Sequence, residues 1–158
     1  MKKVFVIDNN FEFINYIKRE FNILNLDLEI DYKELNEKKT YDYIVVNNIN
    51  EVDICMDNCI GDYYLLNMDM KFDNILFEGN LITYGLGNKN TITISSIAED
   101  KSGFVYCIQR YITEYVIPQE IPINRKFKDN YELYAFMISI TIALIEGISE
   151  NIITSNLE

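Results

Sequence analysis

The chain has 158 residues, a length typical of one domain with a sizeable buried core. Its net charge of −11 and pI near 4.4 disfavour binding to nucleic acid or to anionic membranes, because both need clustered Lys and Arg. No apolar run approaches the roughly 20 residues of a membrane-spanning helix, and three cysteines suit free thiols in a reducing compartment. We therefore expect a cytoplasmic protein.

The first third of the chain alternates strand and helix signals. Residues Val4–Ile7 form an apolar β-branched run that predicts a buried strand, and Asn10 can cap a helix that extends to about Phe21. Residues Asp27–Tyr32 alternate as a half-exposed strand does, and Tyr41–Val46 predicts another buried strand. This βαβ order favours parallel pairing with helices on the faces of the sheet.

The rhythm changes in the second part of the chain. Several short apolar runs separated by turn signals predict an antiparallel meander; they are 63–66, 74–77, 81–84, 91–94, 104–108 and 111–117. Pro118 and Pro122 confine Gln119–Ile123 to an edge strand or a loop, since proline cannot donate a ladder hydrogen bond.

The last strong signal is a helix over Tyr131–Glu146, apolar on nearly all sides and ended by Gly147. Ser149 can start a short terminal helix. The pattern predicts an α/β fold for residues 1–158 as one domain. It combines a partly parallel sheet with flanking helices in the N-terminal half, and an antiparallel β-meander with a long buried helix in the C-terminal half.

Polar side chains follow several of the predicted strands. Because ligands of open α/β sheets bind outside the carboxyl ends of the strands, these side chains are the candidates for a ligand crevice. They are Asp8, Asn9, Asn10, Asn47, Asn48, Asn67 and Asp69.

The residues that usually carry catalysis or metal binding are sparse. There is no histidine to activate a nucleophile, and Cys55 and Cys59, spaced for one helical face, would need further ligands to close a zinc site. Four acids, Asp57, Asp62, Asp69 and Asp73, could pair for hydrolysis, but solvated turns explain them better. We expect no catalytic residue, no metal and no cofactor.

Two further patterns bear on partners. The basic stretch Arg125–Lys128 is short and flanked by Asp129, which indicates a solvated loop. The 12 tyrosines include the local clusters Tyr63-Tyr64 and Tyr131 with Tyr134, which suit either a protein interface or the margin of a core.

Gly85-Leu86-Gly87 is too short for a dinucleotide fingerprint and predicts a tight turn.

The order of segments over residues 41–150 resembles the central ATPase domain of the Mur ligases. The matching segments are a strand ending in Asn-x-Asp, a strand ending in an aromatic residue and glycine, a small meander, a closing helix, and an upstream strand. They lie at Tyr64–Asp69, Leu81–Gly87, Thr91–Ile97 with Gly103–Tyr106, Leu133–Ile148 and Tyr41–Asn48.

The chain departs from that family where the family binds ATP. Mur ligases have a Gly-rich loop ending in Gly-Lys-Thr after the first strand, whereas Asp8-Asn9-Asn10-Phe11 stands here. The histidine of the family's metal-site turn is missing, and Tyr131-Glu132 and Ala135 occupy the positions of a His-Asn pair and an adenine-side Asn. The resemblance thus implies a shortened, non-catalytic relative, without the ligase's C-terminal domain.

A second resemblance concerns the N-terminus. Residues 4–13 and 41–47 look like the first strand and the strand before the phosphoacceptor of a response-regulator receiver domain. Asp8 is then the only acid of the metal-binding pair, and Asn47 or Asn48 stands in the acceptor's place, where an amide cannot form an acyl phosphate. The antiparallel second half does not fit a receiver, which ranks this alternative below the Mur ligase resemblance.

These observations favour a non-catalytic, Mur ligase-like domain (a pseudoenzyme) that acts through a protein partner or as a homo-oligomer, with a possible link to bacterial cell-wall metabolism. The alternatives are a small-molecule-binding protein or enzyme that uses the crevice at the carboxyl ends of the strands, and a degenerate receiver-like module.

Overall fold

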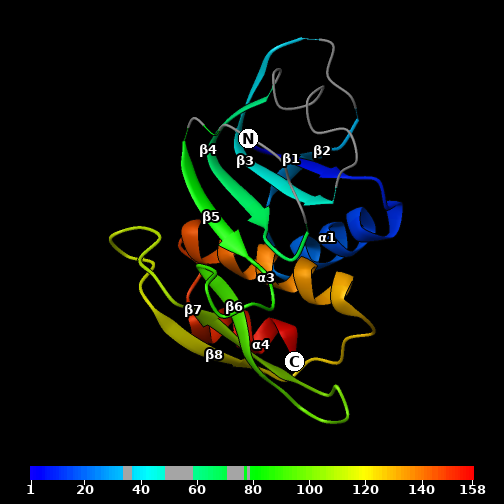
Figure 1. Cartoon of the computed structure of the whole chain (residues 1–158), viewed down its shortest axis with the longest axis vertical. Helices are drawn as coiled ribbons and strands as arrows, with labels where there is room; N and C mark the ends of the chain where they lie inside the picture. The colour runs from blue at the N-terminus through cyan, green and yellow to red at the C-terminus, as the bar shows by residue number, and fades with distance from the viewer. Residues whose placement is uncertain (34–36, 49–58, 71–76, 78) are drawn as a thin grey trace.

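The computed structural model describes residues 1–33, 37–48, 59–70, 77 and 79–158. Within them, strands and helices are arranged as an eight-stranded sheet with helices packed against it (Figure 1). In chain order the elements are β1 (Lys2–Asp8), α1 (Phe11–Ile23), β2 (Leu28–Asp31), β3 (Lys39–Asn48), β4 (Cys59–Asn67), β5 (Asn80–Tyr84), β6 (Ile92–Ile97), β7 (Phe104–Ile108), β8 (Gln119–Ile123), α3 (Asn130–Ile145) and α4 (Glu150–Leu157).

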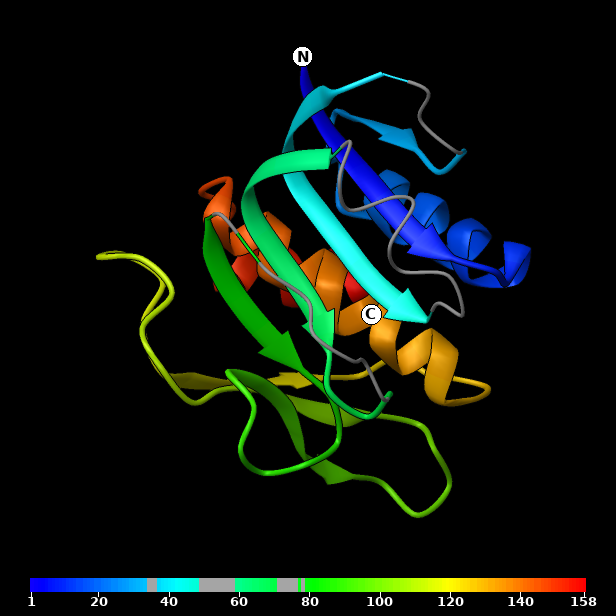
Figure 2. The ribbon, with the colours of Figure 1, turned by 45° about the horizontal axis from the view of Figure 1, so that its top comes forward.

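The sheet is mostly parallel, with an antiparallel end. Its strand order is β2-β1-β3-β4-β5-β6-β7-β8, and every neighbouring pair from β2 to β6 is parallel. The arrowheads of β1, β3, β4 and β5 accordingly point the same way in Figure 2. Among the described strands, only β6-β7 and β7-β8 pair antiparallel. The predicted α/β class is confirmed.

The meander is shorter than the sequence pattern predicts. The expectation that Tyr63–Leu66 and Leu81–Tyr84 belong to it is wrong, because β4 and β5 continue the parallel sheet in register. Short apolar strands have the same pattern in both settings, so periodicity alone does not reveal their direction. The antiparallel end also distinguishes this sheet from the all-parallel, five-stranded sheet that the receiver alternative requires.

Alternation along the parallel strands separates two apolar clusters. One side of β1 carries Val4 and Val6, which pack in the larger core with α1 and α3. The other side carries Phe5 and Ile7, which belong to a smaller cluster with residues of β3 and β4 and with Phe77. This period of two places alternate residues of each strand against the helices. It also decides which polar residues at the strand ends face them.

Helix α3 is buried on nearly all sides because other elements surround it. It packs against α1 and β5, while the core it shares also contains residues of β7, β8 and α4. Figure 1 shows it between the parallel strands and the antiparallel end. A polar contact crosses this packing, since the hydroxyl groups of Tyr106 on β7 and Thr141 on α3 lie 2.7 Å apart.

The helix caps follow the sequence signals. The side chains of Asn10, Asp129 and Ser149 accept hydrogen bonds from backbone N–H groups of the first turns of α1, α3 and α4. Gly147 follows the C-cap of α3 with φ of +90°, a conformation that glycine adopts without strain. The predicted helices 10–21 and 131–146 are confirmed to within two residues at each end.

Four further expectations have different outcomes. Residues 111–117 form a loop and not a strand; the next strand after β7 that pairs with it is β8, which contains Pro122 and lies at the edge of the sheet, as predicted. The predicted strand 74–77 lies, except for Phe77, outside the described residues. Among the described helices, none is long and apolar enough to cross a membrane.

Candidate functional site

The carboxyl ends of β1, β3, β4 and β5 place four polar side chains in one row. Asp8, Asn47, Asn67 and Tyr84 each occupy one of the last two positions of their strands, on the side that faces the helices. Each continues the alternation of the apolar residues before it. Asn47 and Asn67 are fully buried, and Tyr84 is 1% exposed. Sequence reasoning selected the first three as crevice residues, and the structure brings them together.

Hydrogen bonds join this row across the four strands. The Asn47 side chain donates from Nδ2 to Asp8 Oδ2 at 2.7 Å. Its Oδ1 accepts from Asn67 Nδ2 at 2.9 Å and from the Tyr84 hydroxyl at 2.7 Å. The opposite directions of these bonds fix the orientation of the Asn47 amide. We call Asp8, Asn47, Asn67 and Tyr84 the strand-end network.

The strand-end network continues through Asp69 to helix α3. Asn67 Oδ1 accepts from the backbone N–H of Asp69, and Asp69 Oδ2 accepts from the Tyr134 hydroxyl at 2.7 Å and from the N–H of Leu86 at 2.8 Å. Gly85 permits this approach, because a Cβ there would lie 2.6 Å from Asp69 Oδ1. The glycine turn predicted at 85–87 therefore holds a carboxylate.

The remaining predicted crevice residues lie around the network and not within it. Asn10 caps α1 through its side chain, and its backbone N–H donates to Asp8 Oδ1 at 2.6 Å. Asn48 donates to the Tyr131 hydroxyl at 3.2 Å. Asn9 is exposed in the turn between β1 and α1. The edge of the sheet therefore presents polar groups that are largely bonded to one another.

Burial shifts the acid–base behaviour of this edge. It raises the pKa of Asp8 above the ordinary value, and the hydrogen bonds from Asn47 and Asn10 oppose part of that rise. Burial also raises the pKa of Tyr84 and Tyr134, so both hydroxyl groups remain protonated donors at neutral pH. The arrangement can hold a carboxylate in place, but these tyrosines are poor candidates for a base.

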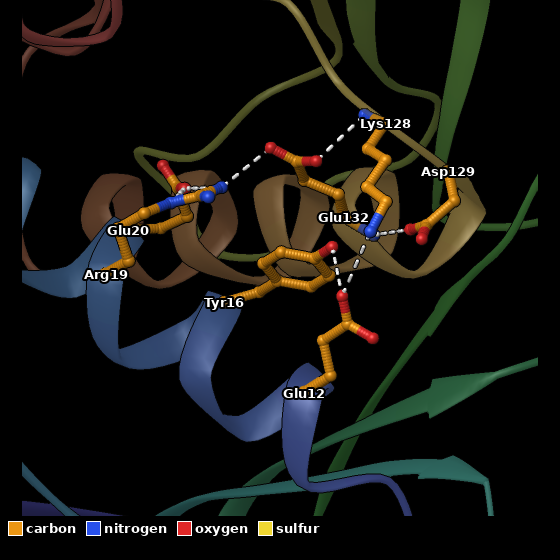
Figure 3. Close-up of polar contacts among 7 residues, drawn as sticks. All are labelled: Glu12, Tyr16, Arg19, Glu20, Lys128, Asp129 and Glu132. Carbon is orange, nitrogen blue, oxygen red and sulfur yellow. Dashed lines mark hydrogen bonds and ion pairs between the residues drawn. The ribbon is translucent and has the colours of Figure 1, made fainter.

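A second polar cluster joins α1 to α3 (Figure 3). Arg19 of α1 contacts Glu20 at 2.6 Å and reaches across to Glu132 of α3 at 2.7 Å. Glu132 also accepts from the backbone N–H of Lys128 at 2.8 Å. At the start of α1, Glu12 accepts from the Tyr16 hydroxyl. Burial, together with this hydrogen bond, raises the pKa of Tyr16 to about 12.

Glu20 is the unusual member of this cluster. Its side chain is fully buried, and Oε2 has no hydrogen-bond partner among the described residues. Burial raises the pKa of Glu20, and the Arg19 guanidinium offsets part of that effect. Arg19 is held by ion pairs to a carboxylate on each of the two helices. These contacts connect α1 to α3 and do not form an open binding site.

Sequence reasoning missed Tyr84 and Glu20 as interacting polar groups. Tyr84 ends a strand at the same edge as the asparagines, which is a usable signal once the parallel direction of β5 is known. Glu20 stands on the buried face of α1 with Ile17 and Phe21, a charged residue at a core position of the helical pattern.

Other sequence candidates do not converge. Asp62 lies in the first half of β4 and Asp69 beyond its end, so at least about 15 Å of extended chain separates them, while Asp57 and Asp73 lie outside the described residues. Cys59 is buried at the start of a strand, and Cys55 lies outside the described residues. Where the structure describes the chain, no group of three or more His, Cys, Asp or Glu side chains is placed to hold a metal ion.

The basic stretch 125–128 has one residue in the core and others at the surface. Phe127 is 7% exposed and packs edge-on against Phe104. Lys128 lies 3.6 Å from Glu12. The stretch therefore anchors the segment before α3, and its charges are spread along it.

Comparison with known proteins relates the fold to the Mur ligases. No protein-family model and no curated protein sequence matches the chain. Among solved structures, MurF from Acinetobacter baumannii has a similar fold, with a TM-score of 0.62 and 9% sequence identity. The similarity covers 99% of this chain but only 45% of that MurF chain. The chain thus has a Mur ligase-like α/β fold and spans less than half the length of that ligase.

Proposed function

We propose that residues 1–158 form one domain, similar to the central domain of Mur ligases, that has lost ligase chemistry and acts through contact with another protein. The observation that carries this proposal is the strand-end network. Its buried amides and carboxylate are bonded to one another at the edge where an α/β sheet usually binds its ligand. The fold similarity supports a place for this domain in cell-wall metabolism.

The turn between β1 and α1 supports the loss of phosphate binding. Phosphate-binding loops use backbone N–H groups at the start of the following helix. Here the N–H of Asn10 donates to Asp8 and the N–H of Glu12 donates to Asn10. The Asp8 carboxylate adds a negative charge where a triphosphate would need positive potential. Both effects disfavour nucleotide binding at this turn.

The loop between β7 and β8 supports a role in protein contact. Tyr111 and Tyr115 are 73% and 86% exposed, and the loop projects from the body of the molecule in Figure 2. Hydrogen bonds within the loop hold its backbone. The N–H of Ile112 donates to the carbonyl of Val116, whose side chain is buried, and the Thr113 hydroxyl accepts from the N–H groups of Tyr115 and Val116. Exposed aromatic side chains on an ordered turn are typical anchors of interfaces. The net charge of −11 favours a basic partner over a second copy.

Titration calorimetry with ATP and Mg²⁺ tests the loss of ligase chemistry. We expect no heat of binding at micromolar nucleotide, and a micromolar dissociation constant would contradict the proposal. The Asp8→Ala variant should also fail to bind ATP. Removing the carboxylate does not supply the lysine of a phosphate loop, and the N–H of Glu12 still donates to Asn10.

A photo-crosslinking amino acid at position 115, introduced in the cells that natively make the protein, tests the contact. We expect one defined protein to be crosslinked from position 115 and not from exposed Asn9. The purified pair should bind less tightly at high salt, and a variant with Tyr111→Ser and Tyr115→Ser should lose binding while keeping its melting temperature. Equal crosslinking from both positions, or an unchanged affinity of the variant, would count against this surface.

A further inference from the structure

A separate cavity lies at the opposite edge of the sheet from the strand-end network. It has a volume of about 310 Å³ and is lined by residues of the α1–β2 turn, the first residue of β1 and the segment after α3. Its apolar wall consists of Leu26, Leu28 and Ile148. This volume lies at the lower end of the range for small-molecule sites, so the occupant must be small.

Two helices end at this cavity. The chain leaves α1 through Asn25, with φ of +56°, and the N–H of Leu26 returns to the carbonyl of Phe21. It leaves α3 through Gly147, with φ of +90°, and the N–H of Ile148 returns to the carbonyl of Ala143. A helix C-terminus carries about half a negative charge, usually balanced by a basic residue in the last turn. Neither helix has one.

The charged side chains of the cavity leave it negative as well. Glu146 and Asp27 supply two carboxylates, whereas Lys2 supplies one ammonium group. Lys2 contacts Glu146 Oε1 at 2.9 Å, and the Tyr43 hydroxyl donates to the same oxygen. Both of these bonds use Oε1, so Oε2 is the carboxylate oxygen that the ammonium group of a ligand can approach. Lys2 is 53% exposed, so it can yield its place without leaving a buried charge.

From this geometry we infer that the cavity binds a small organic ammonium ion with a short apolar chain. The ammonium group lies against Glu146 and the two helix C-termini, in part replacing Lys2, and the apolar chain contacts Leu26, Leu28 and Ile148. The site uses none of the residues of the strand-end network, so its occupation is independent of the proposed function.

The test is an NMR titration of the full chain near neutral pH with n-butylammonium chloride. Butyrate and 1-butanol serve as the anionic and neutral counterparts of the same length. We expect butylammonium to shift the backbone amide signals of 25–28 and 146–148, and to do so at lower concentration than either counterpart. The absence of such shifts, or equal or tighter binding of butyrate or butanol, would overturn the inference.

Two pairs of variants add readouts that a structural role would not move. Lys2→Met should tighten butylammonium binding about threefold, because the ligand no longer competes with an exposed ion pair whose strength corresponds to about that factor. The control is Lys3→Met, since the Lys3 side chain lies 3.9 Å from Glu29 and not at the cavity; it should leave binding unchanged. Glu146→Gln should weaken binding, and Asp27→Asn, at an exposed position, should weaken it without affecting the fold. If Lys2→Met and Lys3→Met behave alike, or if neither carboxylate variant weakens binding, the inference fails.

Discussion

Asn47 holds three neighbours in place with one side chain. It donates to Asp8 and accepts from Asn67 and Tyr84, and the Asn47 side chain itself has no exposure to solvent. A buried polar group without a partner costs about 1–3 kcal/mol. The contribution of Asn47 to stability therefore includes the cost that its partners would incur if it were removed.

Replacing Asn47 with Ala should lower the free energy of unfolding by about 3 kcal/mol. The change leaves an Asp8 oxygen, the Asn67 amide and the Tyr84 hydroxyl without that partner and opens a small cavity. Urea unfolding measures the effect. Asn9→Ala, the same substitution in the exposed turn two residues before α1, should change stability by less than about 0.5 kcal/mol. Equal effects of the two variants would show that the network adds no stability.

At this scale the sequence predicts positions better than contacts. Asp8, Asn47 and Asn67 were expected at the carboxyl edge because each follows an apolar run, and they meet there. That they bond to one another, and so fill the edge, depends on the alternation of four adjacent strands and on Tyr84, whose role requires the parallel direction of β5. That direction cannot be read from a five-residue apolar run.

At the scale of elements, α1 and α3 are joined through Arg19, which contacts Glu20 on its own helix and Glu132 on the other. The cost of this connection falls on Glu20, whose carboxylate is fully buried and has one oxygen without a hydrogen-bond partner in the described part of the chain. Helix positions and caps were predictable from local signals, but this cluster was not. The helical pattern places Glu20 on the buried face of α1, yet it does not indicate that Arg19 and Glu132 are the groups that meet there.

The stability contribution of Glu20 should depend on pH with a definite sign. Burial raises its pKa in the folded protein above the ordinary value of 4.5, so the folded state binds the proton more tightly than the unfolded state. The contribution is therefore fully present below about pH 4.5 and is lost as the pH rises through the folded pKa. Glu20→Gln does not titrate and should gain stability relative to the wild type between about pH 4.5 and pH 7.

Denaturant unfolding of both proteins at the two pH values measures this change. All other titrating groups are shared, so the difference between wild type and variant isolates Glu20. A variant that loses relative stability as the pH rises would show that the Arg19 ion pair outweighs the cost of burial.

The whole molecule combines a mostly parallel sheet, an antiparallel end and a helix enclosed between them. The changing rhythm of the sequence predicts this α/β class. What the rhythm does not predict is where the parallel part stops: β5 and β6 share a single parallel pair, Tyr84 with Ile92, before the direction reverses. Direction depends on which neighbours remain to be paired, which is a property of the complete sheet.

Net charge is the property of the whole chain that predicts its response to salt. With a formal charge of −11, the folded protein repels itself more than the expanded unfolded chain does, and ions screen that repulsion. The described ion pairs other than those of Arg19 involve partly exposed side chains, so screening them costs little. Raising NaCl from about 0.02 M to about 0.5 M should increase the free energy of unfolding by roughly 1 kcal/mol. KCl should act equally, because screening depends on ionic strength. In the variant Glu99→Lys, at an exposed position, a charge of −1 is replaced by +1, so the net charge becomes −9 and the dependence on salt should be weaker. A free energy of unfolding that falls with salt in urea titrations would instead show that the favourable ion pairs outweigh the repulsion. The acidic side chains would then stabilise the fold through specific pairs despite the net charge.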